Sequence, residues 1–73
     1  MERTNPVKLP EAVLSGIEAV RLSGKTNMLD IQMVQKIAFD MEYFEAVLWI
    51  EDNIELYKLG IFAGFEVIEG GDS

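Results

Sequence analysis

The tripeptide Gly24-Lys25-Thr26 is the first candidate for chemistry, because it resembles the end of a phosphate-binding loop. Such a loop has the spacing G-x-x-x-x-G-K-[ST] between a parallel strand and a helix, so that successive backbone amides surround the phosphates. Here the position five residues before Gly24 is Ala19, which lies within a segment of helical pattern. We therefore expect no nucleotide site, and interpret residues 23–30 as a capped turn between two helices.

A group of carboxylates is the second candidate, because carboxylates act as general acids, general bases and metal ligands. Its members are Glu51, Asp52 and Glu55, with Glu45 six residues before Glu51. Catalytic carboxylates need a pocket that shifts their pKa, and a chain of 73 residues can scarcely enclose one. The chain also contains no His and no Cys. We expect no catalytic residue, no cofactor and no metal, and interpret these carboxylates as an exposed acidic ridge that could serve recognition.

A helix-turn-helix is the third candidate, with Gln32, Gln35 and Lys36 as residues that contact bases. The connection over residues 22–30 is longer than the 3–4 residues usual for this motif. The chain has 6 basic and 13 acidic residues and a net charge of −7, whereas nucleic-acid binding requires cations that neutralise phosphates. A small DNA-associated regulator is therefore an alternative, and a solvated or partner-facing polar side is favoured.

Length and composition indicate a single small domain over residues 1–73, in which 49% of residues are apolar. A core of this size supplies only about 3–5 kcal/mol of stability, and without Cys a disulfide cannot add to it. Association with other chains, including copies of itself, is therefore favoured. The acidity disfavours anionic membranes and would suit an inhibitor that occupies a basic, nucleic-acid-binding surface. Neither a signal-peptide pattern nor a membrane-spanning run is present, so we expect a cytoplasmic protein.

The elements that position these residues begin with an extended N-terminal arm over residues 1–9. A first helix is expected over residues 10–22, with Pro10 at its first position and Gly24 as its left-handed C-cap. Gly16 lies inside this helix and costs on the order of 1 kcal/mol relative to Ala, so a neighbour is expected to pack closely against it.

A second helix is expected to begin at Thr26 or Asn27 as its N-cap, with Asp30 in its first turn, and to end near Met41. The break before the next helix is placed near residues 41–43. The inner positions of the second helix recur with the helical period: Leu29, Met33, Val34, Ile37, Ala38 and Met41.

A third and longest helix is expected over residues 43–59, followed by a short extended strip and a frayed tail over residues 65–73. One apolar seam recurs along it at spacings of three and four: Tyr43, Val47, Ile50, Ile54, Tyr57 and Ile61. Phe44, Leu48 and Trp49 extend the apolar surface beyond this seam. For Trp49 two interpretations stay open, packing in the core and contact with a partner. The fold class is therefore all-α, with three helices in a core over residues 10–64, and we expect self-association through the third helix and the strip. The residues expected to contact a protein partner are Phe44, Leu48, Trp49, Glu45, Asp52 and Glu55.

Residues 17–30 carry a further signal, because their sequence resembles the core of a small uncharacterised family from Firmicutes and their phages and prophages. Its pattern is S-G-x-T-N-M-x-D-x-x-x-V-Q, and the similarity covers roughly residues 13–64. It continues through Met33-Val34-Gln35, Ile37-Ala38-Phe39, Tyr43-Phe44-Glu45, Ile50-Glu51 and Tyr57. Two departures stand out, since Leu29 replaces a frequent aromatic residue and Glu42 replaces a common turn glycine.

The resemblance implies a phage or mobile-element context and supplies no activity to transfer. Combined with the surplus apolar surface and the acidic ridge, it favours a non-catalytic accessory protein that binds a host or phage protein. This accessory role in the host cytoplasm is the leading hypothesis, and inhibition of a host defence or nucleic-acid-processing protein is one form that it could take. A DNA-associated transcriptional regulator and a structural subunit of a larger particle are the alternatives.

Overall fold

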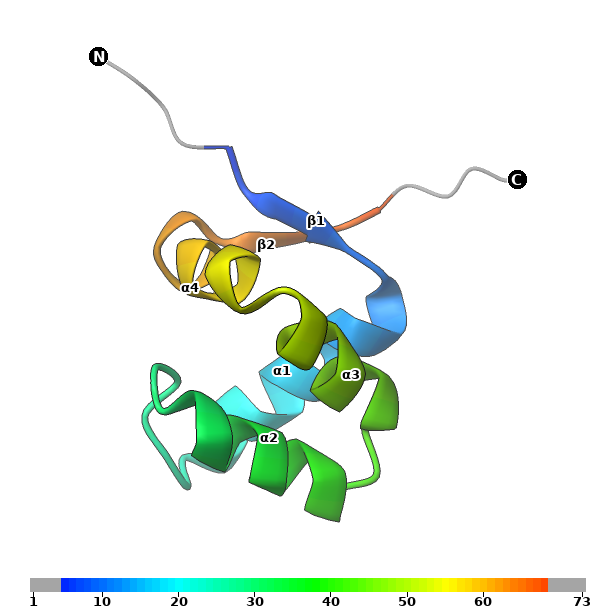
Figure 1. Cartoon of the computed structure of the whole chain (residues 1–73), viewed down its shortest axis with the longest axis vertical. Coiled ribbons are helices and arrows are strands. Elements are labelled where there is room, and N and C mark those ends of the chain that lie inside the picture. Colours follow the sequence, from blue (N-terminus) through cyan, green and yellow to red (C-terminus); the bar gives the residue numbers. More distant parts are fainter. Residues whose placement is uncertain (1–4, 69–73) are drawn as a thin grey trace.

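The computed structural model describes residues 5–68, which form four helices and two short strands. Their order is β1 (Val7–Leu9), α1 (Glu11–Ser23), α2 (Ile31–Asp40), α3 (Phe44–Asp52), α4 (Ile54–Ala63) and β2 (Phe65–Val67). The strands lie together at one end of the molecule, and α2 lies at the other end (Figure 1). The domain is mostly helical, as expected, but the expectation of three helices is wrong. The expected fraying of residues 70–73 lies outside the described residues.

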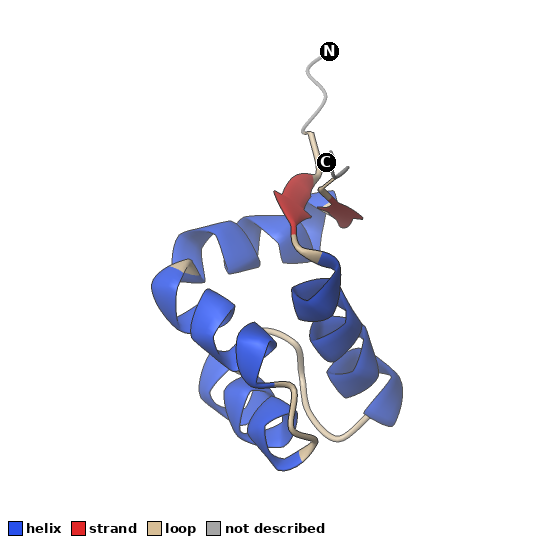
Figure 2. Cartoon of the chain, turned by 90° about the vertical axis from the view of Figure 1, so that its right-hand side faces the viewer, coloured by secondary structure: helices blue, strands red, loops and turns tan. Residues whose placement is uncertain are grey.

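The arm and the strip are both extended, as predicted, and they pair with each other as a parallel two-stranded sheet. Val7 is opposite Phe65 and Leu9 is opposite Val67. The Val7 amide donates to the Gly64 carbonyl at 2.9 Å, and the Ile68 amide donates to the Leu9 carbonyl at 2.9 Å. Figure 2 shows this sheet beside the helices. Val7 and Leu9 are buried and anchor the sheet on the core.

The expected helix over residues 43–59 is interrupted at Asn53, which ends α3 and begins α4. Its backbone has φ −138° and ψ 49°, outside the helical region. The Asn53 side-chain amide donates to the Trp49 carbonyl at 2.9 Å. The backbone carbonyl of Asn53 accepts the Tyr57 amide at 2.8 Å. Asn is suited to such a position because its side chain replaces the interrupted backbone bonds. The break changes the helical phase, so Ile54 is exposed although it belongs to the expected seam.

The predicted end near Leu59 is also wrong, because α4 continues through Gly60 to Ala63. A side chain at residue 60 would collide with the ring of Phe65, which packs directly against this glycine. Gly60 is therefore a contact point between α4 and β2 rather than a helix terminator. The helix ends instead at Gly64, where φ is 97°.

The turn between α1 and α2 confirms the expected C-cap and corrects the N-cap. Gly24 has φ 67°, and its amide donates to the Arg21 carbonyl at 3.2 Å. The N-cap of α2 is Asp30, whose Oδ1 accepts the Met33 amide at 3.3 Å. Asn27 instead accepts the Leu29 amide at 2.7 Å, which forms a local turn before the helix. Thr26 does not cap α2 either, and its hydroxyl donates to the Asn27 carbonyl at 3.4 Å.

The second break lies at residues 41–43, as predicted, and contains the left-handed residue Glu42 with φ 69°. Non-glycine residues rarely adopt this conformation. The Tyr43 amide donates to the Ala38 carbonyl at 2.8 Å, so the turn is closed by a backbone bond.

The core lies where α1 crosses α3, and α2 and α4 complete it. Leu9, Val20, Val34, Ala46, Ile50 and Tyr57 are fully inaccessible to solvent. At Gly16 a Cβ would lie 2.6 Å from the Ala46 Cβ, which confirms the expected close neighbour. Leu29 and Met33 are exposed, contrary to their predicted inner positions, because α2 begins only at Ile31 and turns Val34 and Ile37 inward. Within residues 5–68 the structure contains no helix long and apolar enough to span a membrane.

Candidate functional site

Gln35 links the neighbouring helices α2 and α3 through its side-chain amide. Its side-chain Nε2 donates to the Val47 carbonyl at 3.2 Å and to Glu51 Oε1 at 3.0 Å. The sequence makes Gln35 a candidate for base contact, but in the structure its side-chain amide forms hydrogen bonds with α3. Gln32 and Lys36 are exposed, and Lys36 lies 3.6 Å from Asp40 as an ion pair. The three polar residues of α2 therefore do not share one free surface.

An exposed apolar patch, formed by Phe39, Phe44 and Leu48, lies across the junction of α2 and α3. The rings of Phe39 and Phe44 meet edge to face, with centroids 5.1 Å apart and an interplanar angle of 70°. Leu48 follows Phe44 by one helical turn. The three residues retain 58%, 47% and 64% of their accessible surface, respectively. Large apolar side chains that stay exposed together in a small domain are a typical feature of an interaction surface.

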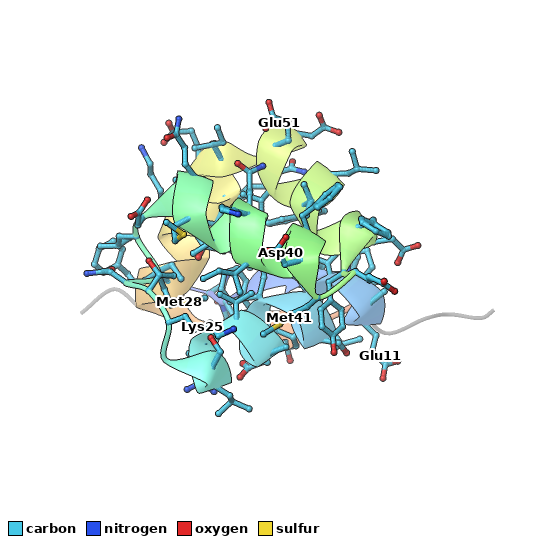
Figure 3. The ribbon with its side chains drawn as sticks, turned by 90° about the horizontal axis from the view of Figure 1, so that it is seen from below. Glu11, Lys25, Met28, Asp40, Met41 and Glu51 are labelled. Carbon is cyan, nitrogen blue, oxygen red and sulfur yellow. The ribbon has the colours of Figure 1, made fainter. Side chains whose placement is uncertain are left out.

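Carboxylates on α3 border this patch. Glu45 is three residues before Leu48 and Asp52 is four residues after it, so both share its side of the helix. Glu51 is exposed one turn after Leu48 and accepts the Gln35 bond. Figure 3 shows Glu51 on α3 and Asp40 on α2. Because α3 carries no Lys or Arg, all of its charged side chains are acidic.

Two of the expected contact residues lie elsewhere. Trp49 is partly buried and packs against the hydrophobic core. Glu55 belongs to α4, beyond the break at Asn53, so it does not share the helix that carries Glu45 and Asp52. Phe39 was missed, because the sequence assigns it neither to the inner face of α2 nor to a partner. Its separation of five residues from Phe44 across a turn is the one signal that could have indicated it.

The connection over residues 24–30 is anchored by Tyr57 of α4. The fully buried tyrosine donates its hydroxyl to the Met28 carbonyl at 2.6 Å. Burial raises the pKa of Tyr57 to about 12, because its charged form would lose hydration. Figure 3 shows Lys25 and Met28 on this connection. Gly24 follows α1 rather than a strand, so the Gly-Lys-Thr sequence has the cap geometry and not that of a phosphate-binding loop.

Two shallow hollows open on the surface formed by residues 5–68. The first, about 220 Å³, is lined by Ala12 and residues 42–45. The second, about 180 Å³, is lined by parts of α1 and α4 that include Arg21 and Gly60. Ligand pockets usually measure about 300–1,000 Å³, so both are smaller than a typical small-molecule site. The patch on α2 and α3 is therefore the stronger candidate for function.

Comparison with known proteins identifies residues 9–64 as a match to the family described as Domain of unknown function (DUF5049). The chain belongs to this family. The match runs from the last residue of β1 to Gly64, and so contains all four helices, the apolar patch and the acidic side of α3. It confirms the resemblance to a small family without an assigned function. No curated protein and no solved structure matches the chain significantly.

Proposed function

We propose that this chain is a non-catalytic accessory protein that binds a partner protein through the apolar patch and the acidic side of α3. The observation that carries the proposal is the exposed cluster of Phe39, Phe44 and Leu48 beside Glu45 and Asp52. An aromatic anchor with an apolar neighbour and a polar rim is the usual composition of an interface centre.

The patch can supply part of the free energy of a complex, and contacts around it must supply the rest. Full burial of one large apolar side chain supplies about 1.5–3 kcal/mol, and the three side chains retain about half of that surface. Their further burial would therefore contribute roughly 2–4 kcal/mol. The rings of Phe39 and Phe44 already meet in the free chain, so binding does not have to bring them together. Carboxylates at the rim add speed of association and choice of partner rather than affinity.

The charge of this surface favours a basic partner. The side of α3 beside the patch has carboxylates and no cation, and the whole chain has a net charge of −7. Proteins that bind nucleic acid present clustered Lys and Arg to phosphates. We propose that the partner is such a protein, and that occupation of its basic surface inhibits it. A phage-encoded protein that acts on a host defence or nucleic-acid-processing protein in the host cytoplasm fits this chemistry.

The alternative of DNA binding has less support. Gln35 bonds α3 and Lys36 pairs with Asp40, while the neighbouring α3 is acidic. A structural subunit of a larger particle has no observation in its favour beyond exposed apolar surface.

The proposal is tested with the full chain immobilised on beads and exposed to host lysate. Partners retained by the wild type are identified, purified and titrated by calorimetry. We expect L48E to weaken the dissociation constant by at least tenfold, because a carboxylate would enter the apolar patch. L22E is the matched control, since Leu22 on α1 is 75% exposed and lies outside the patch. Equal binding by wild type and L48E, or equal loss in L22E, would contradict the assignment of this surface.

Inhibition is tested separately with the purified partner. The nucleic acid that the partner binds and this chain should compete for one site on the partner. Increasing concentrations of that nucleic acid should therefore release increasing amounts of the chain. Simultaneous binding of both would contradict the proposed occupation of a basic surface.

A further inference from the structure

Helix α4 has an apolar stripe that residues 5–68 cover only in part. Its members, Leu56, Leu59 and Phe62, follow one another at intervals of three residues and therefore lie along one side of the helix. Leu56 and Leu59 each retain 44% of their accessible surface, and Phe62 retains 78%. Phe62 is thus a large aromatic side chain held almost entirely in solvent.

The opposite side of α4 packs against the rest of the domain. Tyr57 is fully buried, Gly60 is covered by the Phe65 ring, and Ile61 packs partly against the core. A helix of a monomeric protein normally has polar residues on its other side, whereas α4 is apolar on both. Within residues 5–68 Phe62 therefore contributes little to the packing, and Leu56 and Leu59 keep nearly half of their surface free for a further contact.

The charges of α4 indicate what can cover it. The helix contains one acidic residue, Glu55, and one basic residue, Lys58, and both are exposed. A surface that meets its own copy across a two-fold axis must be self-complementary. One charge of each sign meets this condition, because Glu55 of each copy can pair with Lys58 of the other. The side of α3 that carries Glu45 and Asp52 does not meet it, since two copies there would bring together only carboxylates.

We propose that α4 is a homodimer interface, on which the α4 stripe of a second copy packs in an antiparallel, two-fold arrangement. Phe62 of each copy covers Leu56 of the other, and the Leu59 side chains meet at the axis. The ten-residue helix is about 15 Å long, so the interface is smaller than the roughly 800 Å² per partner of a standard complex. We expect a dissociation constant on the order of 10 µM. The proposal is independent of the proposed function, because it uses a different helix.

Sedimentation equilibrium of the full chain from about 1 µM to about 1 mM tests the proposal directly. The wild type should change from the monomer mass of 8.2 kDa to twice that value within this range. F62E should remain monomeric throughout, because it places two carboxylates in the contact. L48E is the matched control, since it adds the same charge to the apolar patch on α2 and α3 and should dimerise like the wild type. Circular dichroism establishes that each variant is folded.

A charge exchange provides a second measurement that does not depend on the apolar stripe. K58E should weaken the dimer at least tenfold, and the double variant E55K/K58E should restore it. A wild-type chain that stays monomeric at about 1 mM would overturn the proposal. Loss of the dimer in L48E rather than in F62E would overturn it as well, and would move self-association to the patch on α2 and α3. Failure of the double variant to recover would overturn the antiparallel arrangement.

Discussion

Replacement of Gly16 by Ala tests the central contact of the domain, at the crossing of α1 and α3. A Cβ at this position would lie 2.6 Å from the Ala46 Cβ and 2.9 Å from the Tyr43 Cβ. Ordinary carbon contacts are about 3.5–4.0 Å, so α3 would have to move by roughly 1 Å. Neither neighbour can rotate away, because a Cβ atom is fixed to the backbone. The clash therefore acts on the whole helix.

Two opposing terms determine the size of the effect. Ala is favoured over Gly inside a helix by about 1 kcal/mol. Overpacking of a closely packed site costs about 1–3 kcal/mol, and the fixed neighbours place this site at the upper end of that range. We expect a net loss of about 2 kcal/mol in the free energy of unfolding. That is a large part of the about 3–5 kcal/mol expected for a domain of this size.

Urea denaturation followed by far-ultraviolet circular dichroism measures the effect. With an m-value of about 1 kcal/mol/M, the midpoint should fall by about 2 M. The double variant G16A/A46G removes the nearest colliding atom. Its loss of stability should be smaller than the sum of the two single losses by about 1 kcal/mol, which is the coupling between the positions.

G24A is the control for backbone effects, because Gly24 has φ 67° and a methyl group added there would have no other atom within 4 Å. It should lose about 1 kcal/mol through conformation alone and show no coupling to Ala46. A G16A variant as stable as the wild type, or more stable by the helix-propensity term, would refute the close approach of α1 and α3.

Three further predictions concern Tyr57 and Glu42. Y57F should lower the free energy of unfolding by about 1–2 kcal/mol in chemical denaturation, because the Met28 carbonyl loses its buried donor; an unchanged midpoint would contradict that bond. Because burial raises the pKa of Tyr57 from 10.0 to about 12, its contribution is complete below pH 10 and is lost as the pH rises toward 12. The wild type should therefore lose roughly 2–3 kcal/mol more than Y57F between these pH values, and parallel pH profiles of the two would refute the assignment. E42G should raise the thermal midpoint by a few degrees, since glycine relieves the left-handed strain at φ 69°; E42A, which keeps a Cβ, should not.

The features that could be predicted from the sequence depend on residues close to one another in the chain. The helix that ends at Gly24 has its apolar stripe and its cap within one short segment, and Gly16 is anomalous inside that stripe. The cap of α2 lies beyond the expected Thr26 or Asn27, because Asn27 and Asp30 both favour helix starts and Asn27 forms a local turn instead. The hydrogen bond that holds the adjacent Met28 carbonyl comes from Tyr57, which is distant in sequence.

The features that could not be predicted depend on contacts between distant residues. A three-residue strand has almost no pattern of its own, so the pairing of Val7 with Phe65 had no local signal. Asn53 lies within an apolar seam that is continuous in sequence, and the break there accompanies the complete burial of Tyr57 among residues that are distant in sequence. The candidate surface follows the same division. Phe44 and Leu48 are expected from α3 alone, whereas Phe39 joins them through a contact between helices.

The parallel pairing of β1 with β2 determines how the domain responds to mechanical load. A pull on the two ends of the described chain draws β1 toward Val7 and β2 toward Val67, which are opposite directions along the shared strand axis (Figure 1). The bonds at Gly64 and Leu9 are then loaded in shear and resist together, instead of opening one after another as in a zipper. The helices bear tension only after β1 and β2 have separated. The two short strands therefore form the mechanical barrier of the domain, and the rate at which they separate determines when the helices begin to extend.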